Sequence, residues 1–290
     1  MALSAFRRPS RERYNFSMKT QAEKGQIFRS LHERDGTFII PNPWDIGTAV
    51  LLEHLGFEAL ATTSAGYAFS MGRKDNAVGR EAMMSHISAI TSATDLPVSA
   101  DLENGFGDMP DIVAETVRLA ATAGAVGGSI EDATGRSDQP IYEMEYAIER
   151  IKAAVAVVRD LPFVFTLTGR AENYLNGRPD LKDTISRLQA YQEAGADVLY
   201  APGLTSREDI ATVVRSVDRP VNILMGLQGV QIKLTELSAI GVKRVSVGSA
   251  LARAALGAFL RASTEMRDRG TFDFAEEAVK YRDISDMFAA

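Results

Sequence analysis

The chain has 290 residues, of which 46% are hydrophobic and 24% are charged, an ordinary composition for a globular protein with a large buried core. Its formal net charge of −6 gives no basic surface of the kind that binds nucleic acid. Cysteine is absent, which excludes disulfides, thiolate metal sites and a cysteine nucleophile. The three histidines, His32, His54 and His86, fall in segments with a helical pattern, so a histidine-rich metal site is not expected.

The N-terminal segment is polar and carries Arg7, Arg8, Arg11 and Arg13. It has no apolar stretch of the kind that marks a secretory signal. No apolar run elsewhere reaches the roughly 18 residues that span a bilayer. We therefore expect a polar tail over residues 1–20, no membrane partner and a cytoplasmic location.

Short apolar segments alternate with amphipathic segments along the rest of the chain. A first helix is predicted over residues 21–33. Strands are predicted at 37–40, 59–63, 96–101, 127–130, 163–167, 198–200, 221–224 and 244–247. Helices are predicted at 45–55, 80–93, 110–123, 141–159, 181–194, 207–217, 231–240 and 251–269.

Eight such alternations predict an α/β fold with parallel strand pairing, and eight is the number that closes a (β/α)₈ TIM barrel. No linker or change in composition interrupts them. We therefore expect one barrel domain over residues 21–290, including additional C-terminal helices after Gly270. An open doubly wound sheet is the alternative, but no Gly-x-Gly-x-x-Gly motif follows the first strand to support it.

An acidic turn follows the third predicted strand. Asp101 and Glu103 are two residues apart and would share a face at the carboxyl end of the strand. Taken alone, they also fit a solvated turn. In a barrel, however, Glu131 ends the adjacent strand, and the three carboxylates could surround one Mg²⁺, partly through water.

Other polar residues stand at the same ends of the predicted strands, where active sites of barrels form. Arg170 follows strand five, and its planar fork suits capture of a carboxylate or phosphonate, or a salt bridge to Glu172 or Glu131. The backbone of the Ser64-Ala65-Gly66 turn could bind a second anionic group. Substrate contacts are also expected from Asn222 and from Trp44, although a lone tryptophan is more often a core residue than a ligand contact.

Five motifs in order resemble the isocitrate lyase/phosphoenolpyruvate mutase superfamily, from about residue 36 to about residue 260. They are PNPWD at 41–45, ATTSAG at 61–66, DLENGFG at 101–107, GSIED at 128–132 and GRAE at 169–172. The resemblance implies a (β/α)₈ barrel, usually a homotetramer whose last helix is exchanged between neighbouring subunits. It also implies Mg²⁺ chelated by an α-oxo acid substrate, with Mn²⁺ as an alternative ion.

Carried over by position, the resemblance implies a role for each matching residue. Asp101 would be the direct metal ligand, and Glu103 and Glu131 would hold metal-bound waters. Ser64, Ala65 and Gly66 would bind the substrate carboxylate. Arg170 would steady the oxo acid and its developing charge, and Asp75 would match an acidic catalytic residue on the mobile loop after strand two.

The loop after strand four departs from the well-known members of the superfamily. Isocitrate and methylisocitrate lyases carry a Lys-Lys/Arg-Cys-Gly-His motif there, and phosphoenolpyruvate mutases and phosphonopyruvate hydrolases carry lysine and asparagine. Here residues 133–140 read ATGRSDQP, with only Arg136 or Asp138 as possible replacements. A loop without a dedicated acid or base suits loss of CO₂ from an oxaloacetate-like acid.

Three hypotheses follow. The first is a Mg²⁺-dependent lyase that breaks a carbon–carbon bond in a small α-oxo or 2-hydroxy di- or tricarboxylate. The second is a mutase or hydrolase that acts on phosphonopyruvate or a related phosphonate. The third is a non-catalytic α-oxo-acid binder that keeps the pocket.

Overall fold

The computed structural model describes residues 18–288. Most of the predicted tail, residues 1–17, lies outside this part. Of the remaining three residues, Lys19 forms an ion pair with Asp95, and Thr20 caps the first helix. The side chain of Thr20 accepts a hydrogen bond from the backbone of Glu23 and Glu23 accepts one in return, a capping box that fixes where this helix begins.

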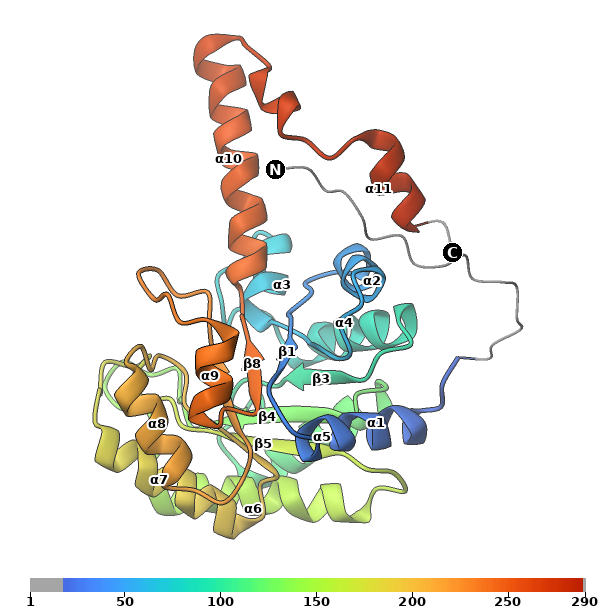
Figure 1. The fold of residues 1–290 in the computed structure, drawn as a ribbon. Helices are drawn as coiled ribbons and strands as arrows, with labels where there is room; N and C mark the ends of the chain where they lie inside the picture. Colours follow the sequence, from blue (N-terminus) through green and yellow to red (C-terminus); the bar gives the residue numbers. More distant parts are fainter. Residues whose placement is uncertain (1–17, 289–290) are drawn as a thin grey trace.

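Eight parallel strands form the centre of the molecule (Figure 1). They are β1 (Phe38–Ile40), β2 (Leu60–Ala61), β3 (Val98–Asp101), β4 (Gly127–Glu131), β5 (Thr166–Arg170), β6 (Val198–Tyr200), β7 (Val221–Leu224) and β8 (Arg244–Ser246). Their order is β1-β8-β7-β6-β5-β4-β3-β2. A hydrogen bond of 3.0 Å from Ala61 N to Pro41 O joins the two ends, so the sheet is a nearly closed barrel. The predicted (β/α)₈ fold is confirmed.

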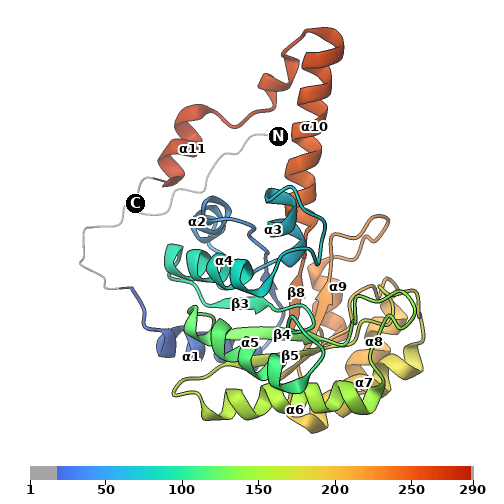
Figure 2. The same ribbon diagram turned by 180° about the vertical axis from the view of Figure 1, so that it is seen from behind.

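Helices surround this barrel (Figures 1 and 2). They are α1 (Gln21–Glu33), α2 (Ile46–His54), α3 (Ser64–Ser70), α4 (Arg80–Ala93), α5 (Pro110–Thr122), α6 (Met144–Asp160), α7 (Leu181–Ala194), α8 (Arg207–Arg215), α9 (Leu234–Ile240), α10 (Ala250–Arg269) and α11 (Tyr281–Phe288), with a short 3₁₀ helix η1 (Asp273–Glu276). Within the described residues, no helix is long and apolar enough to cross a membrane.

The helices pack their apolar stripes on the strands. In α5, Val113, Val117 and Ala121 recur at a helical spacing and are buried. They belong to a core cluster that also contains Leu102 and Ile151. This packing fixes the loop that leaves β3 against α5 and α6.

Two predicted elements differ from the structure in ways that affect the site. The predicted strand at 163–167 is displaced: pairing with β4 begins at Thr166, which lies opposite Gly127, and ends at Arg170. Arg170 is therefore held inside the sheet rather than in a loop after it. The predicted turn at Ser64-Ala65-Gly66 is the first turn of α3, which begins after the N-cap Thr63.

The chain ends in helices that project from the barrel. Figures 1 and 2 show α10 extending away from the strands, with α11 returning beside α2. Ala252 is the one buried residue of the described α10. The predicted helical extension beyond Gly270 is confirmed by η1 and α11.

Candidate active site

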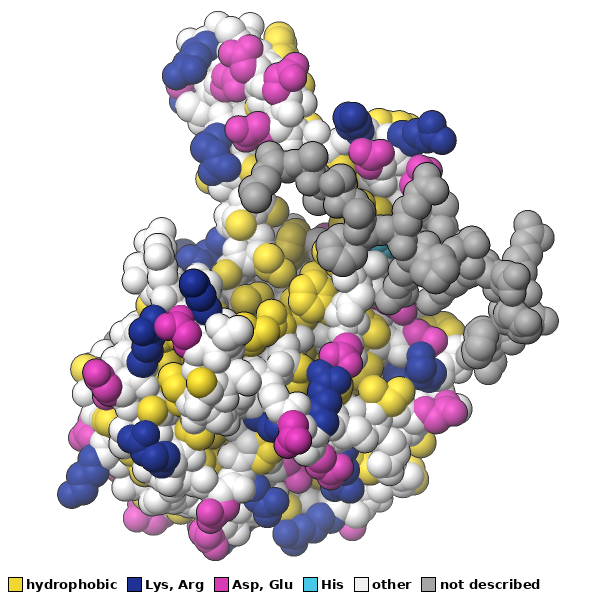
Figure 3. Space-filling view, in the orientation of Figure 1, with side chains coloured by type: hydrophobic (Ala, Val, Ile, Leu, Met, Phe, Trp, Pro, Cys, Tyr) yellow, Lys and Arg dark blue, Asp and Glu magenta, His cyan; other side chains and the backbone are white. Residues whose placement is uncertain are grey.

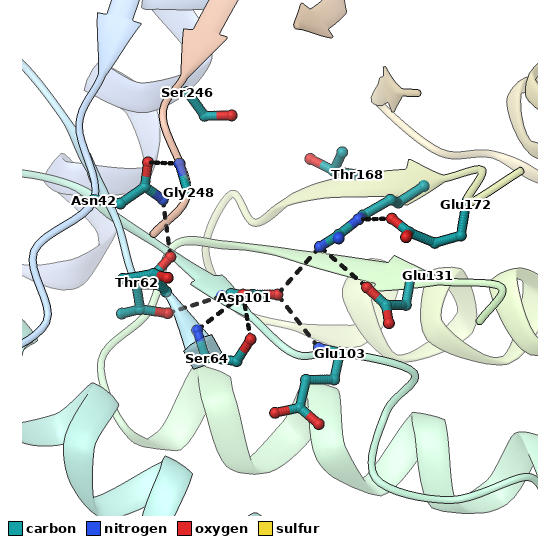
Figure 4. Close-up of polar contacts among 12 residues, drawn as sticks. Asn42, Thr62, Ser64, Asp101, Glu103, Glu131, Thr168, Glu172, Ser246 and Gly248 are labelled. Atoms are coloured by element: carbon teal, nitrogen blue, oxygen red, sulfur yellow. Dashed lines mark hydrogen bonds and ion pairs between the residues drawn. The ribbon is translucent and has the colours of Figure 1, made fainter. Parts of the chain in front are cut away.

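Asp101 is the centre of a polar cluster at the carboxyl ends of β3, β4 and β5 (Figure 4). Its Oδ2 accepts hydrogen bonds from Ser64 N at 3.0 Å and from Ser64 Oγ at 2.8 Å. Its own backbone N–H donates to Thr62 Oγ1 at 2.8 Å. These bonds tie the end of β3 to the start of α3 and fix the direction of the carboxylate.

Arg170 brings three carboxylates together. Its Nη1 lies 3.0 Å from Glu131 Oε2 and 3.5 Å from Asp101 Oδ1, and its Nε bonds Glu172 Oε1. Burial opposes the charge of Arg170, but Glu131 and Glu172 outweigh it and raise the pKa of the guanidinium. The two salt bridges considered from the sequence both form. One cation thus faces three carboxyl groups, so the cluster contains more carboxyl groups than positive side chains.

Glu103 adds a fourth carboxyl group to the cluster. Its side chain is buried, and Oε1 has no hydrogen-bond partner among the described residues. Burial, followed by the negative charges of Asp101 and Asp75, raises the pKa of the Glu103 carboxyl to about 8. Burial likewise raises the pKa of Glu131 despite its contact with Arg170. Leaving such an acceptor unpaired is costly, so a cationic ligand would stabilise the site.

The donor set fits a hard divalent cation. Mg²⁺ prefers carboxylate oxygens and keeps several waters, so the carboxylates need not all touch it. In the described part of the chain, no three Asp, Glu or His side chains already converge on one point as direct ligands. Arg170 Nη1 lies between Asp101 and Glu131 and keeps these two apart. Glu103 Oε1 nevertheless offers a buried acceptor for a bound water.

Asp75 also reaches the cluster, from the loop between α3 and α4. Its Oδ1 lies 3.4 Å from Ser64 Oγ. The loss of surrounding water and the nearby charge of Asp101 raise the pKa of Asp75. The structure thus places Ser64, Asp75, Asp101, Glu103, Glu131 and Arg170 in one site.

Two of the three backbone amides in the predicted anion site, in the first turn of α3, already donate to side chains of the protein. Ser64 N donates to Asp101, and Gly66 N donates to Thr63 Oγ1 at 3.2 Å. Ala65 N lies in the same turn, where the helix itself provides no acceptor. Of the three amides, Ala65 N is the one best placed to bind a substrate oxygen.

The contacts of Trp44 and Asn222 are with residues other than the clustered carboxylates. Trp44 is half-buried, and its Cβ packs so close to Gly66 that a side chain at Gly66 would lie 3.2 Å from it. Asn222 is buried, with Nδ2 donating to Ser246 Oγ at 2.9 Å and Oδ1 accepting from Arg244 Nε at 2.9 Å. Both roles in substrate binding remain predictions.

Two residues important for the site stand at the ends of predicted strands but were given no role in the site from the sequence. Asn42 bridges the seam of the barrel, because Nδ2 donates to Thr62 O and Oδ1 accepts from Gly248 N (Figure 4). Asp132, considered above only as part of the GSIED motif, is buried and accepts from Glu172 N at 2.8 Å. Their positions just after β1 and β4 could have indicated that both residues lie near the site.

A cavity of about 1060 Å³ lies at the opposite end of the barrel. Its lining includes Arg29, Phe163 and Asp197, which precede strands or lie on α1. The carboxylates around Arg170 do not line it. The chemistry of the site therefore resides in the polar cluster and not in this groove.

Comparison with known proteins agrees with the motifs. The family model described as phosphoenolpyruvate phosphomutase matches residues 28–267. The chain belongs to this family. Members and neighbours with assigned activities include lyases and mutases, and the protein is an enzyme of the isocitrate lyase/phosphoenolpyruvate mutase superfamily.

Three relatives illustrate the range of sequence identity and of activity in the family. A Burkholderia cenocepacia protein of known crystal structure, classed only broadly as a lyase/mutase, is 67% identical, with a TM-score of 0.91, covering 93% of this chain and 97% of that one. The 2-methylisocitrate lyase of Aeropyrum pernix is 28% identical over 85% of this chain and 81% of its own length. The oxaloacetate decarboxylase of Paraburkholderia xenovorans is 28% identical over 77% and 74%.

Proposed function

We propose that the protein is a Mg²⁺-dependent lyase that breaks a carbon–carbon bond in a small α-oxo or 2-hydroxy di- or tricarboxylate. Decarboxylation of an oxaloacetate-like acid is the simplest such reaction. The observation that carries the proposal is the cluster in which Arg170 faces Asp101, Glu131 and Glu172, beside the unpaired buried oxygen of Glu103. This excess of carboxylate oxygen suits a divalent cation and an oxo acid that chelates it.

Asp101, Glu103 and Glu131 would hold the Mg²⁺, with Mn²⁺ as the alternative. Asp101 would be the direct ligand and the two glutamates would act through water, as the family resemblance implies. A bound ion stabilises negative charge on the oxo oxygen of the substrate. A structural neighbour, a phosphonopyruvate hydrolase crystallised with oxalate and Mg²⁺, supports this choice of ion and ligand class.

The residues of the chain would orient the acid and accept its charge. Arg170 is fixed by Glu172 and points its Nη1 toward Asp101 and Glu131, where it can donate to a substrate oxygen that becomes negative. Ala65 N would bind the carboxylate that stays with the product. In decarboxylation the electron pair of the broken bond passes into the neighbouring carbonyl, CO₂ leaves, and the carbon takes a proton from water.

The loop after β4 supports a lyase without a dedicated acid. Residues 133–140 contain no cysteine, histidine or lysine. Arg136, one of the two possible replacements, forms an ion pair with Asp108 over 2.7 Å. A reaction that takes its proton from water needs no further group from this loop. The oxaloacetate decarboxylase among the relatives supports the same class of reaction.

The test is pyruvate formation from oxaloacetate in the presence of Mg²⁺, beside 2-methylisocitrate and dimethylmalate. Asp101→Ala is the blank, because it removes the proposed direct ligand. Turnover above this blank on any of the three acids supports the proposal. Wild-type turnover no greater than the blank on all of them contradicts it.

Two alternatives give different results in related experiments. Phosphorus NMR with phosphonopyruvate detects cleavage or migration of the phosphorus–carbon bond, as a mutase or hydrolase would catalyse. Tight oxalate binding by calorimetry, without turnover of any substrate, is the result expected of a non-catalytic binder.

We also propose a homotetramer in which α10 packs on a neighbouring subunit. The helix carries large apolar side chains that the barrel does not cover, with Phe259 64% and Leu260 61% exposed. Figure 3 shows apolar side chains gathered at the base of this projecting helix. Exposed apolar surface of this kind favours a protein partner, and the family resemblance implies that the partner is a second copy of the chain.

A further inference from the structure

The loop that leaves β3 has an unusual backbone. Glu103, Gly105 and Phe106 have φ values of +49°, +82° and +58°. Glycine adopts such values freely, but a residue with a side chain is strained in this left-handed region. Two non-glycine residues therefore hold a conformation that they would not adopt alone. Contacts from elsewhere must keep it.

Arg150 of α6 supplies the main contacts. Its Nη1 donates to Gly107 O at 2.8 Å and also bonds Asp108 O, while Nη2 bonds Asn104 O. The side chain is only 1% exposed. Its guanidinium thus joins three carbonyls of one loop, from a helix about 45 residues further along the chain.

The hydrogen-bond acceptors of the Arg150 guanidinium are the backbone carbonyls of this loop. Among the described residues it forms no ion pair with a carboxylate, and the ring of Tyr142 lies 4.2 Å from its guanidinium. Burying a cation without a carboxylate partner is destabilising, and hydrogen bonds to carbonyl oxygens offset only part of the desolvation free energy. If this position of α6 served only to pack the core, an apolar side chain would be more stable there.

Thr116 of α5 also binds the backbone of this loop. It is fully buried, and its Oγ1 donates to Gly105 O at 2.7 Å. Gly105 lies so close to Val113 that a side chain there would come within 2.9 Å of Val113 Cγ2. The loop is thereby fixed on α5 and α6 together.

We propose that Arg150, assisted by Thr116, is a positioning residue that holds residues 104–108 so that Glu103 keeps its carboxylate in the metal and substrate site. The inference deepens the proposed function and rests on it for the identity of the ion. Glu103 itself contacts the site, and Arg150 acts on it through the backbone of the loop. Without these bonds Glu103 relaxes toward ordinary backbone angles and its carboxylate leaves the cluster.

The test compares four variants in two measurements. Arg150→Met removes the three bonds, Arg150→Lys keeps the charge with fewer donors, and Thr116→Val removes one bond with little change of shape. Arg159→Met is the control, because Arg159 lies exposed on the same helix. The measurements are Mn²⁺ binding by calorimetry and amide hydrogen exchange of the metal-free protein, read peptide by peptide.

We expect Arg150→Met to raise the Kd for Mn²⁺ at least tenfold and to speed exchange at residues 103–108 at least tenfold, with exchange in β4 and β5 unchanged. For Arg150→Lys, the Kd for Mn²⁺ and the exchange rate at residues 103–108 should lie between those of Arg150→Met and the wild type. Thr116→Val changes both quantities in the same direction by a smaller factor and decides the matter if Arg150→Met does not fold. Arg159→Met behaves as the wild type.

Two outcomes overturn the proposal. One is wild-type loop exchange and wild-type Mn²⁺ affinity in Arg150→Met and Thr116→Val. The other is faster exchange spread evenly over the barrel, which assigns Arg150 to general stability. Failure of the wild type to bind Mn²⁺ contradicts the proposed function instead, while loop exchange still shows whether Arg150 holds the loop.

Discussion

Arg187 Nη1 lies 3.0 Å from Asp132 Oδ2, and both side chains are at most 4% exposed. Asp132 also accepts from Tyr191 Oη at 2.6 Å and from Glu172 N at 2.8 Å. Glu172 in turn pairs with Arg170. The buried Asp132–Arg187 pair therefore helps to fix Glu172, and Glu172 orients the guanidinium of Arg170 in the site.

Breaking this pair is expected to destabilise the fold. Arg187→Met leaves Asp132 buried without its cation, which costs about 3–5 kcal/mol. Arg34→Met, which breaks the exposed pair with Glu58, is the control and costs at most about 1 kcal/mol. Urea unfolding measures both losses. Equal losses would show that burial of the Asp132 pair has no such effect.

Replacing Arg170 is expected to separate turnover from metal binding. Arg170→Met removes the donor aimed at the developing charge and lowers kcat about 100-fold or more. It also removes a positive charge next to Asp101 and Glu131, so the variant binds Mn²⁺ at least as tightly as the wild type. Arg170→Lys retains the charge without the fork and recovers part of the rate. Loss of Mn²⁺ binding in Arg170→Met would contradict this role.

Stability is expected to fall in mild acid because of buried histidines. Burial lowers the pKa of His86 to about 4, whereas in the unfolded chain it is about 6.5. Between these values the unfolded state binds a proton that the folded state does not, so the free energy of unfolding decreases as pH falls. Burial and the charge of Arg244 lower the pKa of His32 to about 3, with the same sign.

The carboxyls whose pKa is raised by burial act in the opposite direction, so a variant isolates the histidine effect. His86→Phe keeps the ring that stacks on Tyr67 at 3.8 Å and removes the titration. Between pH 7 and pH 5 it should lose about 2 kcal/mol less than the wild type in denaturant unfolding. An identical loss in the two proteins would show that His86 takes up its proton equally in both states.

A methyl group on Gly25 is expected to be poorly tolerated. Its Cβ would lie 2.3 Å from Val164 O, where α1 crosses the segment before β5. Gly25→Ala should cost about 1–3 kcal/mol through overpacking. Gly47→Ala in α2, whose Cβ would meet only ordinary contacts from 3.5 Å outward, is the control and should be neutral or stabilising. Thermal unfolding distinguishes them, and similar melting temperatures would contradict the clash.

The proposed tetramer gives a prediction at the projecting helix. Phe259→Glu places a charge on the exposed apolar face of α10 and should dissociate the assembly, while the folded barrel stays intact. Arg261→Glu on the same helix, a change of charge without loss of apolar surface, is the matched control. Light scattering coupled to size exclusion measures the mass. A wild-type protein that is monomeric at micromolar concentration would contradict the proposal.

Much of the fold was predictable from local patterns. The alternation of apolar and amphipathic segments predicted all eight strands, and the order of motifs placed Asp101, Glu131 and Arg170 at one end of a barrel. The strand at 163–167 was displaced in the prediction because its apolar residues 163–165 precede the paired strand: Phe165 belongs to the buried core, the backbone of Val164 approaches Gly25 of α1, and pairing starts only at Thr166. Apolar character alone does not distinguish these two fates.

By itself, the sequence determined the barrel and the residue types at its carboxyl end, since side-chain periodicity and strand ends are properties of neighbouring residues. Only the tertiary structure decided which charges meet. Asp132 and Arg187 are 55 residues apart, and Arg150 reaches a loop more than 40 residues earlier. Coulomb energy and burial depend on distance in space, so the partners of Arg170, the unpaired oxygen of Glu103 and the support from Arg150 were fixed only when the chain folded.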